Sequence, residues 1–113
     1  MNIIRSYPEN LSNRQKYDLC MSPNTQKMSD QKGQRLEFSA YALYEDVDKK
    51  TGEVKEILTL QTPEGETYGT NSATFRTDFF SMVDLFGDEF HALEIIGGTS
   101  KNGRPYITCA YSD

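Results

Sequence analysis

The stretch SATFRTDFFSMVDLF, residues 72–86, decides the fold class, because its helical period stands between segments with a strand period. Its apolar residues recur at spacings that place them on one face of a helix: Phe75, Phe79, Met82, Val83 and Phe86. Ser72 or Thr74 can cap the start, and Gly87 suits the position after the last turn. The sequence therefore predicts a helix over residues 72–86.

The segments on both sides of this helix alternate apolar and polar residues, which is typical of half-buried strands. One strand is expected from Arg35 onward, followed by strands over 54–62 and 66–71. The last two should form a hairpin through the turn Pro63-Glu64-Gly65. Two more strands, over 92–96 and 105–111, are expected after the helix, joined by a loop with an Asn-Gly step.

This order, β-β-β-α-β-β in about 80 residues, is the pattern of the OB-fold, a five-stranded barrel used mainly to bind single-stranded nucleic acid or oligosaccharide. We therefore expect a mainly β protein with one helix, an OB-fold-like five-stranded barrel over residues 35–113. Residues 1–34 lack a clean period and are expected to form an irregular or short-helical N-terminal arm. A short helix within 11–20 and a helical turn around 26–29 are expected in this arm, and arm and barrel form a single domain.

The net charge of −5 argues mildly against nucleic acid, but the charge is unevenly distributed. Residues 1–35 carry six cations against three anions, whereas residues 36–113 carry six cations against fourteen anions. Because the local field decides whether a phosphate backbone is attracted, a basic arm on an acidic barrel is compatible with DNA binding.

Several function classes are disfavoured by composition and spacing. The chain has one histidine, His91, and its two cysteines, Cys20 and Cys109, have no metal-ligand spacing. Glu45, Asp46 and Asp48 lack the spacing of a calcium loop. We therefore expect no catalytic residues, no metal site, no cofactor and no enzymatic activity. Without an apolar run of membrane-spanning length or a secretory signal, the expected location is cytoplasmic, away from membranes.

Aromatic and basic side chains on the expected ligand-facing parts are the candidate binding residues, because single-strand binders stack bases on aromatic rings and contact phosphates with Lys and Arg. The candidate stacking residues are Tyr41, Tyr44, Tyr68, Tyr106 and Tyr111. The candidate phosphate contacts are Lys27, Arg35, Arg76, Lys101 and Arg104. Tyr41 alternates with Leu36 and Phe38 and is expected to point outward. The alternatives stay open: these tyrosines fill the rim of the barrel, and Lys101 and Arg104 are solvated charges of an ordinary turn.

Three stretches carry a resemblance to a known family: Thr70 to Phe75, Gly98 to Thr108, and Ser22 to Met28. In these stretches the chain resembles the small single-stranded DNA-binding proteins encoded by phages and mobile elements of Gram-positive bacteria. The resemblance implies an OB-like barrel that coats single-stranded DNA during replication or recombination in a bacterial host cell. Replication or recombination proteins, and further copies of the chain, are partners that this reading leaves open.

A second hypothesis belongs to another class, a small phage-type inhibitor that binds a host defence or replication protein, with an acidic surface that imitates nucleic acid. The distribution of charge separates the two. A cationic groove lined by Tyr41, Tyr106, Lys101 and Arg104 would favour DNA binding. A continuous acidic face would favour mimicry, formed by Glu45, Asp46, Asp48, Glu64 and Glu66.

Overall fold

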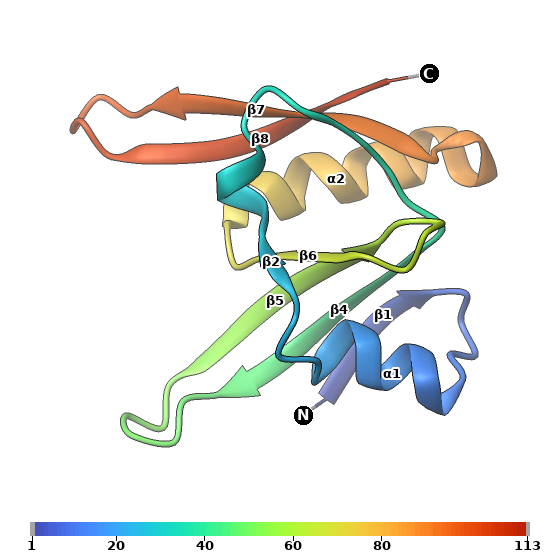
Figure 1. Cartoon of the computed structure of the whole chain (residues 1–113). Helices are drawn as coiled ribbons and strands as arrows, with labels where there is room; N and C mark the ends of the chain where they lie inside the picture. Colours follow the sequence, from blue (N-terminus) through green and yellow to red (C-terminus); the bar gives the residue numbers. More distant parts are fainter. Residues whose placement is uncertain (1, 113) are drawn as a thin grey trace.

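The computed structural model describes residues 2–112 and shows two β-sheets with two α-helices (Figure 1). In chain order the elements are β1 (Asn2–Tyr7), α1 (Asn13–Cys20), β2 (Gln26–Lys27), the 3-10 helix η1 (Met28–Gln31), β3 (Arg35–Glu37), β4 (Ala40–Val47), β5 (Val54–Gln61), β6 (Thr67–Thr70), α2 (Ala73–Phe86), the 3-10 helix η2 (Gly87–Glu89), β7 (Ala92–Thr99) and β8 (Pro105–Tyr111). The predicted mainly β class is confirmed. None of the helices within residues 2–112 has the length and apolar character needed to cross a membrane.

The strand predicted from Arg35 onward is divided between the two sheets. Its first part, β3, pairs with β7 in a three-stranded sheet of order β3-β7-β8, and its second part, β4, pairs with β5 in a five-stranded sheet of order β1-β4-β5-β6-β2. The chain changes sheets at Phe38-Ser39, between β3 and β4. Among the described residues no pairing joins β6 to β8, so the two sheets do not close into one barrel.

The predicted central helix is present as α2. The Ser72 hydroxyl caps it by accepting a hydrogen bond from the Phe75 N–H at 3.2 Å, and Gly87 ends it with φ of 58°. Phe75 and Phe79 are fully buried, as the helical period predicts. Ser72 also donates a hydrogen bond to the Ile107 carbonyl, and the Thr108 hydroxyl donates to Asp78, so α2 is fixed along β8.

The N-terminal region is more regular than the expected irregular or short-helical arm. Residues 2–7 form an edge strand, β1, which pairs antiparallel with β4. The short helix is confirmed as α1, with a capping box in which Ser12 and Gln15 bond each other's backbone N–H. The expected helical turn lies slightly later, as η1. The sequence did not predict β1, because a short strand on a sheet edge has little periodic signal of its own.

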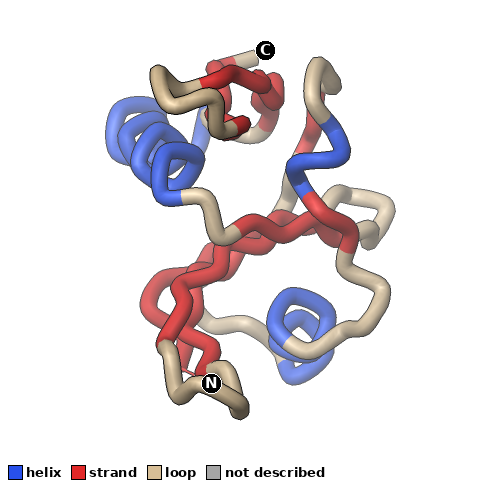
Figure 2. The backbone as a smooth tube through the Cα atoms, turned by 90° about the vertical axis from the view of Figure 1, so that its left-hand side faces the viewer, coloured by secondary structure: helices blue, strands red, loops and turns tan. Residues whose placement is uncertain are grey.

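Other elements pack on both faces of the five-stranded sheet (Figure 2). The larger core, which includes Phe75, Phe79 and Leu60, lies between this sheet, α2 and the three-stranded sheet. On the other face Leu11 and Leu19 pack against Ala40 and Ala42 and form a smaller core. The small alanine side chains in β4 let α1 approach the sheet closely, so the helix covers this part of the sheet face.

Candidate functional site

A groove of about 1250 Å³ opens at the end of the molecule where two hairpins project. The β4–β5 and β7–β8 hairpins extend to the same side, the left of Figure 1, and η1 lies between their bases. Lining residues come from the β4–β5 hairpin, from β6 and the turn after it, from residues 25–32 and from the start of β8. Among the described residues the groove therefore follows the side on which β6 and β8 do not pair with each other.

The floor of the groove is the part of the five-stranded sheet that α1 leaves open. Tyr44 and Ile57 are cross-strand neighbours at the edge of the smaller core, and Thr59 pairs with Gly69 one step further. The Thr59 hydroxyl is buried and makes no hydrogen bond of normal geometry. It nevertheless lies near the Tyr44 hydroxyl, and this proximity lowers the pKa of Tyr44. The larger effect, burial, raises the pKa of Tyr44. The floor is thus polar and uncharged at neutral pH.

Four ammonium groups surround this floor and give the groove a more basic character than the chain as a whole. The cations among the lining residues are Lys27, Lys32, Lys49 and Lys55, and the anions are Asp30, Asp46 and Asp48. In the entire chain, by contrast, 17 acidic residues outnumber 12 basic ones. Four lysines against three aspartates give the groove a small positive excess, so an anionic ligand meets a more favourable local field here than over the chain as a whole.

Three of the five candidate stacking tyrosines are buried. Tyr41 is 6% exposed and packs against Phe38, Phe79 and Phe80, so the expectation that it points outward is wrong. The break in the strand at Phe38-Ser39 is the reason. It shifts the alternation by one residue, so Phe38 and Tyr41 both face the larger core.

Tyr44 and Tyr68 are also unavailable for stacking on a ligand, with 8% and 9% of their surfaces exposed. Tyr44 belongs to the smaller core and reaches the groove only at its edge. Tyr68 belongs to the larger core, and its hydroxyl donates to Glu66 at 3.4 Å. The alternative reading, in which such tyrosines fill the structure, holds for all three.

The remaining two tyrosines are exposed, but only one lines the groove. Tyr106, on β8, is 41% exposed and is a lining residue. Tyr111 is 37% exposed at the other end of β8, where its ring stacks on Phe86 at a centroid distance of 4.0 Å. Tyr106 is therefore the candidate for base stacking in the groove, whereas Tyr111 covers the end of α2.

The predicted cations are distributed over different parts of the molecule. Lys27 lines the groove, and Lys101 and Arg104 lie on the tip of the β7–β8 hairpin, beside the lining residue Pro105. Arg76 donates to the Glu56 carbonyl at 2.7 Å and ties α2 to β5. Arg35, on β3, donates to Glu37 at 2.8 Å and to Ser112 at 3.0 Å. Arg76 and Arg35 thus make structural contacts away from the groove.

Sequence reasoning did not single out three groove lysines, Lys32, Lys49 and Lys55. Lys55 is the cross-strand neighbour of Asp46 in the β4–β5 hairpin. The charged residues on both sides of the turn were the sequence signal for a charged hairpin end. Lys32 carried no such signal, because the path of the segment 25–34 between β6 and β7 is what places it at the groove. Gly33 donates a backbone hydrogen bond to Ile95 at 2.7 Å and holds this segment in place.

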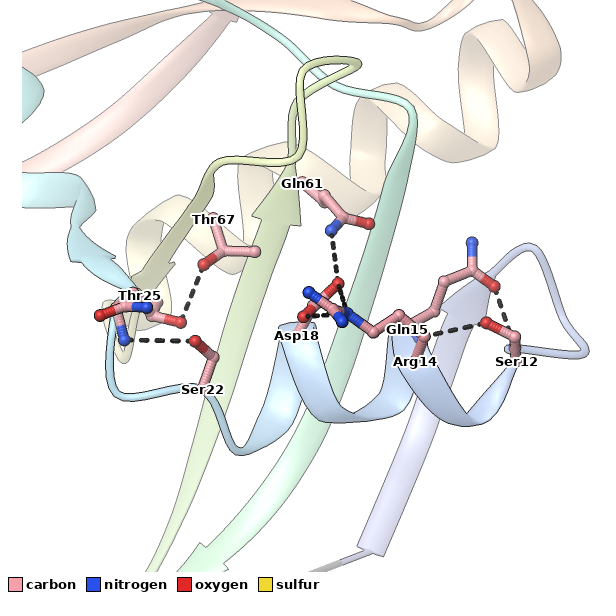
Figure 3. A network of polar contacts seen from close by, with 9 residues as sticks. Ser12, Arg14, Gln15, Asp18, Ser22, Thr25, Gln61 and Thr67 are labelled. Atoms are coloured by element: carbon pink, nitrogen blue, oxygen red, sulfur yellow. Dashed lines mark hydrogen bonds and ion pairs between the residues drawn. The ribbon is translucent and has the colours of Figure 1, made fainter.

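A second, smaller hollow of about 500 Å³ lies between α1 and the β5–β6 turn. Several polar side chains around it form hydrogen bonds with other residues of the protein (Figure 3). Asp18 accepts hydrogen bonds from Arg14 and from Gln61, which link α1 to β5. Thr25 and Thr67 share a hydrogen bond of 3.0 Å, which links the segment after α1 to β6. These polar groups are already partnered, so this hollow fastens α1 to the sheet.

Within residues 2–112 no three His, Cys, Asp or Glu side chains lie together in a way that would hold a metal ion. Both thiols are shielded: burial raises the pKa of Cys20, and it raises the pKa of Cys109 to about 12. The groove instead collects four ammonium groups, three carboxylates, amides, hydroxyls and the exposed residue Tyr106, a set suited to a polar ligand with anionic groups that hydrogen-bonds and stacks.

Comparison of the chain with models of known protein families, with curated protein sequences and with solved structures gave no match.

Proposed function

We propose that the protein binds single-stranded DNA in the groove between its two hairpins. The observation that carries the proposal is the association of four lysines with the exposed ring of Tyr106 around one open groove. Lysines neutralise phosphates, and an exposed ring offers a stacking surface to any base, which is the combination that sequence-tolerant single-strand binders use. The expectation that the protein is not an enzyme belongs to this proposal.

The connectivity supports an OB-related architecture for this binder. The divided strand β3–β4, the β5–β6 hairpin, α2 and the β7–β8 hairpin follow one another in the OB order, with the first strand shared between both sheets. In OB-folds the ligand lies on the second and third strands, between the loop that joins strands one and two and the loop that joins strands four and five. The groove here has that relation to β5, β6 and the two hairpins. We propose an OB-type barrel left open between β6 and β8.

The competing function, an acidic mimic of nucleic acid, finds less support. Its five proposed residues lie around three different hollows. Asp46 and Asp48 line the groove among the lysines, Glu64 and Glu66 line the hollow beside α1, and Glu45 lines a third hollow with Arg76. A mimic of a phosphate backbone needs one continuous row of negative charge, whereas these residues are divided among three hollows, each of which is also lined by lysine or arginine.

Fluorescence polarisation with labelled oligo-dT, oligo-rU and duplex DNA, each titrated with salt, tests the proposal. We expect micromolar or tighter binding of oligo-dT at low salt, weaker binding of duplex DNA, and a clear loss of affinity as salt rises. Absence of binding at about 50 mM salt, or binding that does not depend on salt, would refute phosphate recognition in the groove.

A further inference from the structure

The eight glycines of the chain fall into two groups that differ in the reason for glycine. Five have a positive φ in turns or at the end of α2, and an added Cβ would meet nothing within 4 Å. At these positions the backbone conformation requires glycine. The other three, Gly69, Gly97 and Gly98, have no positive φ; an added Cβ would clash with a side chain at Gly97 and Gly98 and make a tight contact with one at Gly69. At these three the space is what matters.

Gly98 has the closest neighbour of the three. A Cβ at this position would lie 2.5 Å from Cζ and 2.6 Å from the hydroxyl oxygen of Tyr106, its cross-strand partner. The far end of the Tyr106 ring therefore lies directly over the β7 backbone. An aromatic ring placed on a cross-strand glycine is a known way to stabilise a strand pair, and it also fixes where the ring lies.

The other two glycines leave room for side chains of residues that line the same groove. A Cβ at Gly97 would lie 2.8 Å from Cδ of Lys32, and one at Gly69 would lie 3.2 Å from Cγ2 of Thr25. Lys32, Thr25 and Tyr106 all line the groove. The glycines that the backbone conformation does not explain are thus the ones beneath or beside groove-lining side chains.

We infer that Gly98 is a positioning residue for ligand stacking: because it has no side chain, the Tyr106 ring can pack on the β7 backbone at this position. This inference rests on the proposed function. Replacement of Gly98 by alanine leaves the backbone conformation accessible, so the ring must move. Gly97, whose Cβ position faces the other side of β7, leaves room for Lys32, but a methyl group there would cost little because the flexible lysine stem can shift.

A double-mutant cycle tests the inference, with Gly98→Ala, Tyr106→Ala and both together, measured by oligo-dT polarisation and by thermal unfolding. We expect Gly98→Ala to weaken binding by up to the loss seen for Tyr106→Ala, between about 5-fold and about 150-fold. The dependence on salt should stay unchanged, because the phosphate contacts remain. In the Tyr106→Ala background Gly98→Ala should have no further effect on binding, since the ring that it displaces is gone.

Gly87→Ala is the matched control, because it places a methyl group at a positive-φ glycine where nothing lies within 4 Å. It should lower the unfolding temperature and leave the affinity of the folded protein unchanged. Unchanged binding by Gly98→Ala, or an equal loss in both backgrounds, would overturn the role of Gly98. A wild-type protein that does not bind oligo-dT would instead overturn the proposed function, and the unfolding temperatures of the same proteins would still show whether the ring depends on Gly98.

Discussion

The same face of the five-stranded sheet is covered at one end and open at the other. Under α1 the sheet presents Ala40 and Ala42, and Leu19 of the helix packs on them with 1% of its surface exposed. Further along the strands the same face presents Lys55 and Gly69, which line the groove. The same sheet face therefore contributes to the core under α1, and beyond it provides the surface to which we assign the proposed binding; the residue types change from apolar to polar and charged between the two parts.

The covered end should show the largest effect on stability. Leu19→Ala removes a fully buried side chain between α1 and the sheet and should cost about 2–5 kcal/mol of the free energy of unfolding. Chemical denaturation monitored by circular dichroism measures this loss. At a temperature where the variant stays folded, its affinity for oligo-dT should equal that of the wild type. A variant that folds as stably as the wild type would show that α1 is only loosely attached.

The open end should show the largest effect on binding. Tyr106→Ala removes the exposed ring in the groove and should cost about 1–3 kcal/mol of binding free energy, with little change in the salt dependence. Tyr111→Ala is the matched control, because Tyr111 has similar exposure but stacks on Phe86 away from the groove. If both variants lose equal affinity, stacking in the groove is not what binds the ligand.

The groove lysines should change the salt dependence rather than the specificity. Lys27→Ala combined with Lys55→Ala should make the negative slope of log affinity against log salt shallower by about 1.4, since each phosphate contact on a single strand contributes about 0.7 to its magnitude. Binding to oligo-dT and to a mixed sequence should weaken to the same extent. The paired variant Lys101→Ala, Arg104→Ala is the comparison, and a larger change in slope there would move the phosphate path to the hairpin tip.

The smallest effect at neutral pH concerns Cys109, which lies in the larger core. Burial raises its pKa from the usual 9.0 to about 12. The folded protein therefore favours the neutral thiol, and this contribution to stability is present below pH 9 and is lost as the pH rises toward about 12. Unfolding temperatures across this range should fall less steeply for Cys109→Ala than for the wild type. Equal slopes would show that the thiol contributes nothing.

Much of the fold followed from the sequence, because it rests on local patterns. The period of Phe75 and Phe79 and the cap at Ser72 predicted α2, and turn residues predicted the β5–β6 and β7–β8 hairpins. The site followed only in part. The period of two in the strand from Arg35 did not reveal the break at Phe38-Ser39, and this break buries Tyr41.

The covering of the sheet by α1 also escaped the sequence, because it depends on contacts between residues far apart in the chain. Leu19 meets Ala42 only once β4 has taken its place in the sheet. The same holds for Lys32, which joins the groove through the backbone bond of Gly33 to Ile95. Long-range placement of this kind leaves no periodic trace.

Amide chemical shifts recorded during an oligo-dT titration would show where on the protein single-stranded DNA lies, which in the proposed function is the open end of this sheet face. We expect the largest shifts along the groove, at Lys27, Lys55, Gly69 and Tyr106, and at Gly98 against the Tyr106 ring, with small shifts in α1 and at the C-terminal end of α2. Shifts concentrated around Arg35 or Leu85, with the groove unchanged, would contradict this placement.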